Sequence, residues 1–260
     1  MRALIVLGSF LLCCAAAMPR TTNVGCPDGF VRVNGEYCPS VQAECLEWID
    51  PPDAAARRCR AYGPSTCGTK TVHRDFCMER TEHTEGAFAK LQTGPAPVQS
   101  VHQHPSLDSL LPLVNVNYWQ ARDVCRAEGA DLCDEDQFEM ACEGPSYYNY
   151  PTGQVRDCAK CNCDVDANIG IDFEHRVDHR KPVNEVAECR SGYGVESLVG
   201  NADEWVRKSR SASQYESVLR GGHWLKIRAR CTPNAATTGH GPLFSSLEVG
   251  FRCCRDVSLP

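Results

Sequence analysis

Apolar residues recur at helical spacing directly after Asn117. Within residues 118–128, one face carries Ala121, Val124 and Cys125, which is the pattern of a helix that buries that face. Asparagine favours the N-cap of a helix, and Gly129 is a residue that favours its end. The pattern therefore predicts a helix over 118–128.

A second helix is predicted a few residues later. Asp134 and Gln137 have the spacing of a capping box. The segment that follows places Phe138 and Ala141 on one side and runs through Cys142. Gly144-Pro145 then ends it.

The rest of the chain shows little periodicity. Residues 26–77 are dense in cysteine, proline and glycine, which predicts short strands and loops held by disulfides. Residues 92–112 contain four prolines and are predicted to form a loop. At 260 residues the chain is long enough for a real core. Two helices among many short segments predict a loop-rich α+β domain.

The first residues have the pattern of an export signal. Met1-Arg2 precede an apolar run from Ala3 to Ala17 that ends in small residues, which predicts a signal peptide over 1–17. The run is too short to span a bilayer. Acylation of Cys13 or Cys14, as in a lipoprotein, is the alternative. We expect a secreted or periplasmic protein without a transmembrane span.

The net charge of the chain argues against two classes of binding partner. The formal net charge is -6, so no basic excess is present to neutralise phosphates or to dock on anionic lipid. The composition therefore argues against a nucleic-acid partner and against docking on an anionic membrane.

Cysteine is the unusual residue. The chain has 18 cysteines, and those outside the expected signal are even in number, which is typical of a disulfide framework in an exported protein. Cys158, Cys161 and Cys163 also have metal-ligand spacing, as do His175 and His179. In an oxidising compartment we favour disulfides for the three cysteines. Spacing alone assigns no partners.

A series of motifs resembles the formylglycine-generating enzyme (sulfatase-modifying factor) family. The resemblance runs over nearly the whole chain after the expected signal, and the order of the motifs makes it specific. They are Cys26–Val33, Phe76–Thr84, Pro112–Cys125, Gly129–Cys142, Tyr150–Gly153, Gly194–Val206, Arg220–Trp224 and Gly250–Cys253.

The resemblance implies a C-type-lectin-like α+β fold with little regular structure. We expect a cysteine-rich segment over 18–77 that leads into the family domain at 78–260, with 26–254 as one compact unit. The resemblance also implies the disulfides Cys125–Cys253 and Cys142–Cys231. Arg252 is expected to pair with an acid, either Glu204 or Glu82.

The resemblance further implies structural calcium. The family's oxygen ligands carry over to Ser197, Gly200, Ala202 and Glu204, and a second site would begin at Asn168 and Ile169. Oxygen ligands of this kind suit Ca²⁺. Ser197 departs from the usual asparagine or aspartate. Hydrogen bonding to loop backbone is the alternative for Asn168 and Glu204.

The catalytic segment departs most from the family. The family enzyme oxidises a sulfatase cysteine to formylglycine with O₂ and a Cu(I) ion held by two thiolates. Here the segment from Gly221 is several residues shorter and contains one cysteine, Cys231, which aligns best with a structural disulfide. An ungapped alignment instead puts Lys226 and Cys231 at the two copper positions, so either alignment removes the thiolate pair. A protonated amine does not replace a thiolate on Cu(I), so we expect no copper.

Three functions follow from this departure. The first is a non-catalytic module that binds a protein or glycan, with His223, Trp224 and Arg228 lining the former groove. Taken as a single residue, Trp224 is expected to pack in the core, and we favour that interpretation over a place in the groove. The second is a thiol oxidase that uses a repositioned cysteine such as Cys254. The third is a structural envelope protein.

Overall fold

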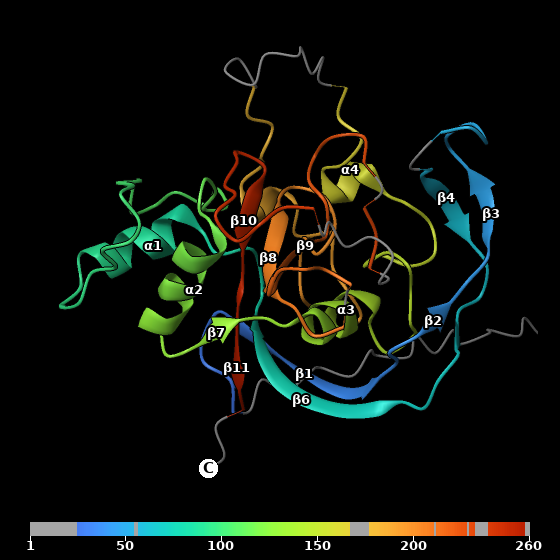
Figure 1. Cartoon of the computed structure of the whole chain (residues 1–260), viewed down its shortest axis with the longest axis horizontal. Coiled ribbons are helices and arrows are strands. Elements are labelled where there is room, and N and C mark those ends of the chain that lie inside the picture. Colours follow the sequence, from blue (N-terminus) through green and yellow to red (C-terminus); the bar gives the residue numbers. More distant parts are fainter. Residues whose placement is uncertain are drawn as a thin grey trace, which may run out of the picture.

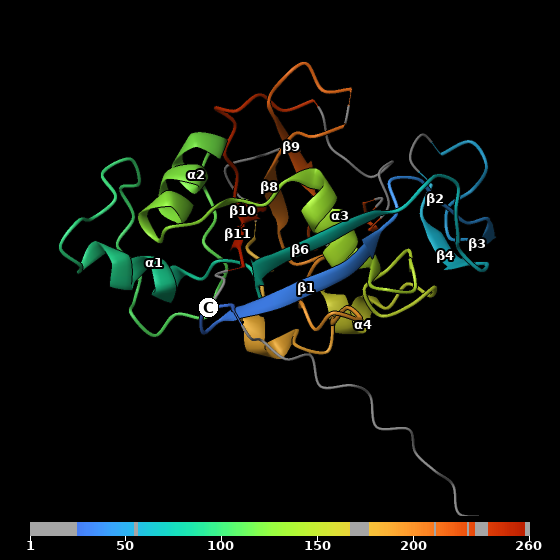
Figure 2. The same cartoon turned by 90° about the horizontal axis from the view of Figure 1, so that it is seen from below.

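The computed structural model describes residues 25–54, 57–166, 177–210, 212–227, 229–231 and 239–257. Its longest feature is a curved antiparallel ribbon of β1 (Phe30–Tyr37) and β6 (Val72–Glu79), paired from Phe30↔Glu79 to Tyr37↔Val72. Strands β11 (Cys253–Asp256) and β7 (Asp131–Leu132) extend it to the order β1-β6-β11-β7. Figures 1 and 2 show the ribbon running beneath helix α3.

A second sheet occupies the centre of the molecule. Its order is β10 (Val249–Phe251), β8 (Asp203–Arg207) and β9 (Ser217–Arg220), with β8 parallel to β10 and antiparallel to β9. Strand β8 is buried on both faces. Val206 packs in the cluster with β1, β6 and α3, and Trp205 packs in the cluster with α2 and β10.

Both predicted helices are present. Helix α2 (Tyr118–Ala127) begins at an Asn117 capping box, and α3 (Glu135–Glu143) begins at an Asp134 capping box. The structure adds α1 (Glu85–Gln92), which the sequence reasoning missed, the short α4 (Cys158–Cys161) and a 3₁₀ turn at Val183–Glu185. Thr84 caps α1 by accepting a hydrogen bond from the amide of Ala87.

The cysteine-rich segment between β1 and β6 folds as a ladder of nested loops. Strands β2 (Val41–Gln42) and β5 (Thr66–Cys67) pair, and β3 (Cys45–Trp48) pairs with β4 (Cys59–Tyr62) beyond them. Each disulfide lies inside the loop closed by the one before it: Cys26–Cys77, Cys38–Cys67 and Cys45–Cys59. In Figure 1 this blue segment projects away from the rest of the domain.

The sequence places the end of the cysteine-rich segment at residue 77, and the parts of the chain before and after that residue share one sheet. Strand β6 crosses that position, and β6 pairs with β1 on one side and with β11 on the other. Among the described residues, no helix is long and apolar enough to cross a membrane.

Candidate functional site

The segment Gly221–Cys231, which the resemblance aligns with the family's copper-binding segment, is anchored to the core. Gly221 and Gly222 adopt φ of 92° and 76°, values that favour glycine. The amide of Gly222 donates to the Asp203 carboxylate at 2.7 Å. Trp224 is 2% exposed, so it packs in the interior and cannot line a groove. Only His223 of the three predicted groove residues keeps part of its surface exposed in the described chain, and Arg228 lies outside the described residues.

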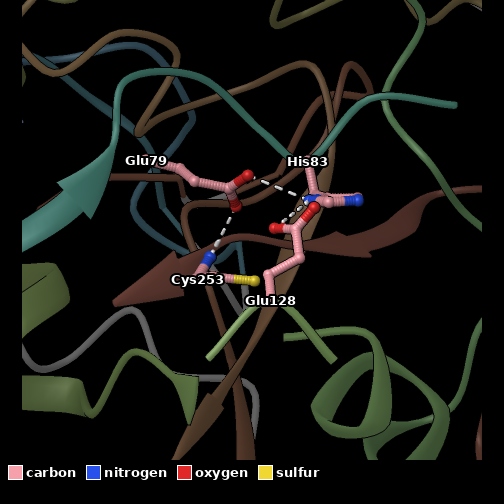
Figure 3. Close-up of side chains that lie close together, drawn as sticks. All are labelled: Glu79, His83, Glu128 and Cys253. Atoms are coloured by element: carbon pink, nitrogen blue, oxygen red, sulfur yellow. Dashed lines mark hydrogen bonds and ion pairs between the residues drawn. The ribbon is translucent and has the colours of Figure 1, made fainter. Parts of the chain in front are cut away.

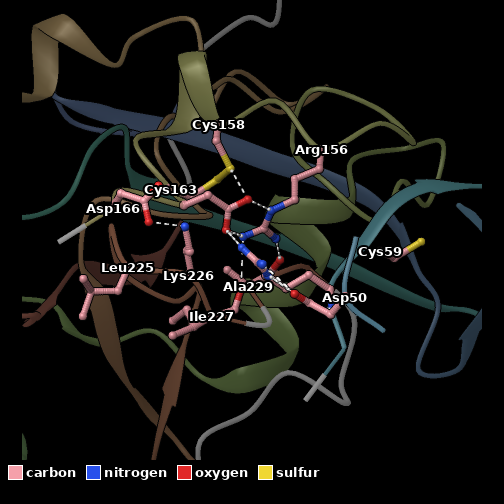
Figure 4. A network of polar contacts seen from close by, with 12 residues as sticks. Asp50, Cys59, Arg156, Cys158, Cys163, Asp166, Leu225, Lys226, Ile227 and Ala229 are labelled. Atoms are coloured by element: carbon pink, nitrogen blue, oxygen red, sulfur yellow. Dashed lines mark hydrogen bonds and ion pairs between the residues drawn. A yellow bond between two sulfur atoms is a disulfide. The ribbon is translucent and has the colours of Figure 1, made fainter. Parts of the chain in front are cut away.

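Figure 4 shows the polar network that holds this segment. The Arg156 guanidinium donates to the backbone carbonyls of Ala229 at 2.8 Å and Ile227 at 3.1 Å. It also pairs with Asp164 at 2.9 Å. Burial raises the pKa of Asp164, but hydrogen bonds and charge from Arg156 and Arg58 outweigh that effect and leave it below its ordinary value.

The network continues into the nested loops. Arg58 bridges Asp164, at 2.7 Å, to Asp50, at 2.6 Å. Asp50 and Arg58 lie at the two ends of the loop between β3 and β4. This hairpin is therefore fixed relative to the segment Gly221–Cys231.

Every cysteine in the described part of the chain is in a disulfide. Cys231 is bonded to Cys142 and Cys253 to Cys125, the pairs that the resemblance implies. Cys254, the thiol that an oxidase would need, is bonded to Cys133. The expectation of a repositioned Cys254 thiol is wrong, because β11 places that sulfur against Cys133 after β7.

The cluster Cys158, Cys161 and Cys163 forms disulfides, as favoured over metal binding. Cys158 pairs with Cys163, and Cys161 pairs with Cys189. These bridges fasten α4 beside the segment that contains Asp164.

Two motifs far apart in the sequence meet in a buried ion pair. Both oxygens of Glu204 accept hydrogen bonds from Arg252 at 2.6 Å, and neither side chain is exposed. Arg252 also donates to the carbonyl of Glu196 at 3.0 Å. The predicted acid partner of Arg252 is thus Glu204. Glu82 lies nearby, and burial raises its pKa to about 8.

The predicted calcium ligands lie on the loop that enters β8. Among them, Ser197 and Gly200 have positive φ, of 55° and 82°. Glu204 is the only carboxylate of the set, and Arg252 already neutralises it. A dication on the same oxygens would face the guanidinium charge, which repels it. Asn168 and Ile169 lie outside the described residues.

Sequence reasoning missed two polar groups that the fold assembles. One is the Arg156–Asp164 network, whose partners have no motif. The other is His83 with Glu79 and Glu128, of which only the first two are close in sequence. A histidine four residues after a glutamate was the only available signal.

Comparison with known proteins identifies the family. The model of the sulfatase-modifying factor enzyme 1-like domain matches residues 52–257. A cattle (Bos taurus) protein named inactive C-alpha-formylglycine-generating enzyme 2 is 30% identical over 159 residues, which cover 57% of this chain and 52% of that protein. The mouse (Mus musculus) protein of that name is 29% identical over 160 residues, covering 58% and 51%. The chain thus spans about half the length of the curated relatives it matches.

Solved structures show the same fold at low sequence identity. CarF matches with a TM-score of 0.60 and 14% identity, covering 89% of this chain and 99% of CarF. PvdO from Pseudomonas aeruginosa matches with a TM-score of 0.55 and 18% identity, covering 87% and 94%. The predicted fold, the C-type-lectin-like α+β fold of formylglycine-generating enzymes, is confirmed. By the family match over residues 52–257, the chain belongs to the sulfatase-modifying factor enzyme 1-like domain family.

Proposed function

We propose that this chain is a non-catalytic, exported binding module that does not generate formylglycine. The observation that carries the proposal is the pairing of every described cysteine. Cu(I) requires soft thiolate ligands, and Cys231 is 1% exposed and bonded to Cys142. The names of the two curated relatives, which call them inactive, agree with this. Eight disulfides are typical of a protein that folds in an oxidising compartment.

The β3–β4 hairpin offers the best-supported contact surface. Leu46 and Trp48 are 66% and 42% exposed, and the Arg57 guanidinium lies 4.0 Å from the Trp48 ring centroid. Val155, 58% exposed, follows Gln154, whose carbonyl accepts from a β4 amide. Exposed aromatic, arginine and apolar side chains are characteristic of protein interfaces.

This hairpin is also rigid enough to serve as a binding surface. The Cys45–Cys59 disulfide joins its strands, and Asp50 with Arg58 connects it to the network around Asp164. A pre-ordered surface loses less conformational entropy on binding. We therefore propose a protein partner for the hairpin, in place of a groove formed by Trp224.

An aldehyde assay tests the missing chemistry. The chain, purified with its disulfides intact, is incubated with a sulfatase-type cysteine peptide, Cu(I), O₂ and ascorbate, and the peptide is analysed by mass spectrometry. Ascorbate keeps copper as Cu(I) and supplies the two further electrons that reduction of O₂ to water needs, without reducing the disulfides. We expect no conversion of the cysteine to an aldehyde. Catalytic accumulation of aldehyde would contradict the proposal.

A pair of tryptophan variants tests the surface. Trp48→Ala removes the exposed ring of the hairpin, and Trp119→Ala removes a ring on α2 of similar exposure, 39%. A partner captured by the wild-type chain should bind Trp48→Ala at least about tenfold more weakly, as expected for a central aromatic contact, and should bind Trp119→Ala normally. Equal loss in both variants, or enrichment of a glycan alone on an array, would contradict the assignment.

Calcium binding by Ser197, Gly200, Ala202 and Glu204 stays a prediction of the family resemblance. The Glu204–Arg252 pair weighs against it. Thermal unfolding with added Ca²⁺ or with a chelator is the test. A saturable rise in Tm would establish the site, and an unchanged Tm would remove it.

A further inference from the structure

Glu79, His83 and Glu128 converge at one point (Figure 3). Glu79 ends β6, His83 follows four residues later, and Glu128 follows α2. His83 Nδ1 lies 2.9 Å from Glu79 Oε1 and 4.0 Å from Glu128 Oε2. We propose that these three side chains bind one zinc ion.

The donor set fits zinc. One imidazole nitrogen and two carboxylate oxygens are ordinary ligands for Zn²⁺, with bonds of about 2.0–2.2 Å. Ligand atoms around a tetrahedral ion at that radius are about 3.3 Å apart. This value lies between the 2.9 Å and 4.0 Å that separate His83 Nδ1 from the oxygens of Glu79 and Glu128. An imidazole ligand disfavours Ca²⁺ and Mg²⁺, which take oxygen donors.

The surroundings hold the ligands in place. Glu79 Oε2 accepts a hydrogen bond from the Cys253 amide at 2.7 Å, and the His83 ring stacks on Phe251 with centroids 5.0 Å apart. The sulfur of Cys253 is bonded to Cys125 and supplies no thiolate. Outer contacts of this kind orient metal ligands.

The cluster carries more negative charge than one imidazolium neutralises. The His83 side chain is fully buried, and its Nδ1 faces both Glu79 and Glu128. Its Nε2, which has no hydrogen-bond partner among the described residues, lies on the opposite side of the ring and takes no part in the site (Figure 3). With the imidazole protonated, two carboxylates still leave a net negative charge beside a buried ring. A Zn²⁺ ion that replaces the proton on Nδ1 neutralises both carboxylates.

An entry path is present. Glu128 has 26% of its side chain exposed and lines a cavity of about 730 Å³ between α1 and residues 107–110. Solvent ions can therefore reach the cluster from this cavity, and a water from the same side can complete the coordination of zinc.

Zinc titration of the full chain, with metal removed and all disulfides intact, tests the proposal. We expect one Zn²⁺ per chain by calorimetry and by elemental analysis after gel filtration. Glu128→Gln keeps the shape of a partly exposed ligand and should weaken binding at least about tenfold, because even outer-shell changes cost 10–100-fold. His83→Gln should abolish tight binding.

A matched control separates this cluster from adventitious surface binding. His73 lies 3.3 Å from Glu36 on the exposed ribbon, with side-chain exposures of 61% and 52%. His73→Gln should leave the tight site unchanged. The proposal is overturned if the wild-type chain retains no stoichiometric zinc, if Glu128→Gln binds as tightly as wild type, or if His73→Gln removes the site. Circular dichroism of each variant confirms that loss of zinc is not loss of fold.

Discussion

Arg252→Met should destabilise the fold severely and in a pH-dependent way. The substitution keeps an apolar stem but removes the guanidinium that pairs with both oxygens of Glu204. It also removes the donors to the carbonyls of Glu196 and Ser197, at 3.0 and 3.3 Å. Arg252 and Glu204 are both 0% exposed, so water does not replace the lost contacts.

The magnitude follows from these contacts. Removing one partner of a buried ion pair costs about 3–5 kcal/mol, and each lost carbonyl hydrogen bond costs about 1 kcal/mol. We expect a total loss of about 5–7 kcal/mol in the free energy of unfolding. For a domain of this size that lowers Tm by about 10–28 °C.

Lowering the pH should restore part of the stability that Arg252→Met loses. Burial raises the pKa of Glu204, and the charge of Arg252 opposes that rise. Without Arg252 the pKa of Glu204 in the folded chain rises further. Between the unfolded pKa and this raised folded pKa, Glu204 takes up a proton on folding, so stability falls as pH rises. Above the folded pKa the penalty is constant. The loss relative to wild type should therefore be at least about 1 kcal/mol smaller at pH 5.5 than at pH 7.5.

Urea unfolding under non-reducing conditions measures both effects. Glu204→Gln is the matched variant, because it leaves a buried arginine that cannot lose its proton, so its loss should not shrink in acid. A cost below about 1 kcal/mol for Arg252→Met, or the same cost at both pH values, would refute the assigned role of the pair.

Three further predictions address other parts of the site. Replacing Cys142 and Cys231 by serine should lower the free energy of unfolding by about 4–5 kcal/mol in urea, because their bridge spans a sequence separation of 89; an unchanged midpoint would contradict the bridge. Burial raises the pKa of Glu143 well above its ordinary value, so wild-type stability should fall as pH rises from the ordinary carboxyl pKa towards the raised one. Glu143→Gln should lack that fall in urea titrations from acid to neutral pH, and a parallel pH profile would count against the assignment. Arg156→Met leaves the carbonyls of Ile227 and Ala229 without their donor, so limited proteolysis should cut residues 221–231 faster, whereas Arg190→Met, at a pair whose arginine is 53% exposed, should not change the rate.

Local signals accounted for what could be predicted. The helices after Asn117 and Asp134 were identified because capping and apolar spacing act within a few residues. Helix α1 was missed, although Thr84 caps it, because only Phe88 and Ala89 mark its buried face beside Gly86.

Contacts between distant segments could not be predicted from the residues alone. The nested order of Cys26–Cys77, Cys38–Cys67 and Cys45–Cys59 depends on how β1 meets β6. The Cys125–Cys253 and Cys142–Cys231 pairs came from the family resemblance. For Trp224 the favoured expectation, core packing, agrees with the structure, whereas its place in a groove lining, which came from the position of the segment in the family, is wrong.

Peptide mapping of the unreduced, alkylated chain tests the central claim most directly. The account predicts that all cysteines from Cys26 to Cys254 are protected from alkylation, and that a peptide containing Cys142 is cross-linked to one containing Cys231. Alkylated Cys231 together with a second free thiol in the same molecules would restore a thiolate pair for copper and contradict a non-catalytic function.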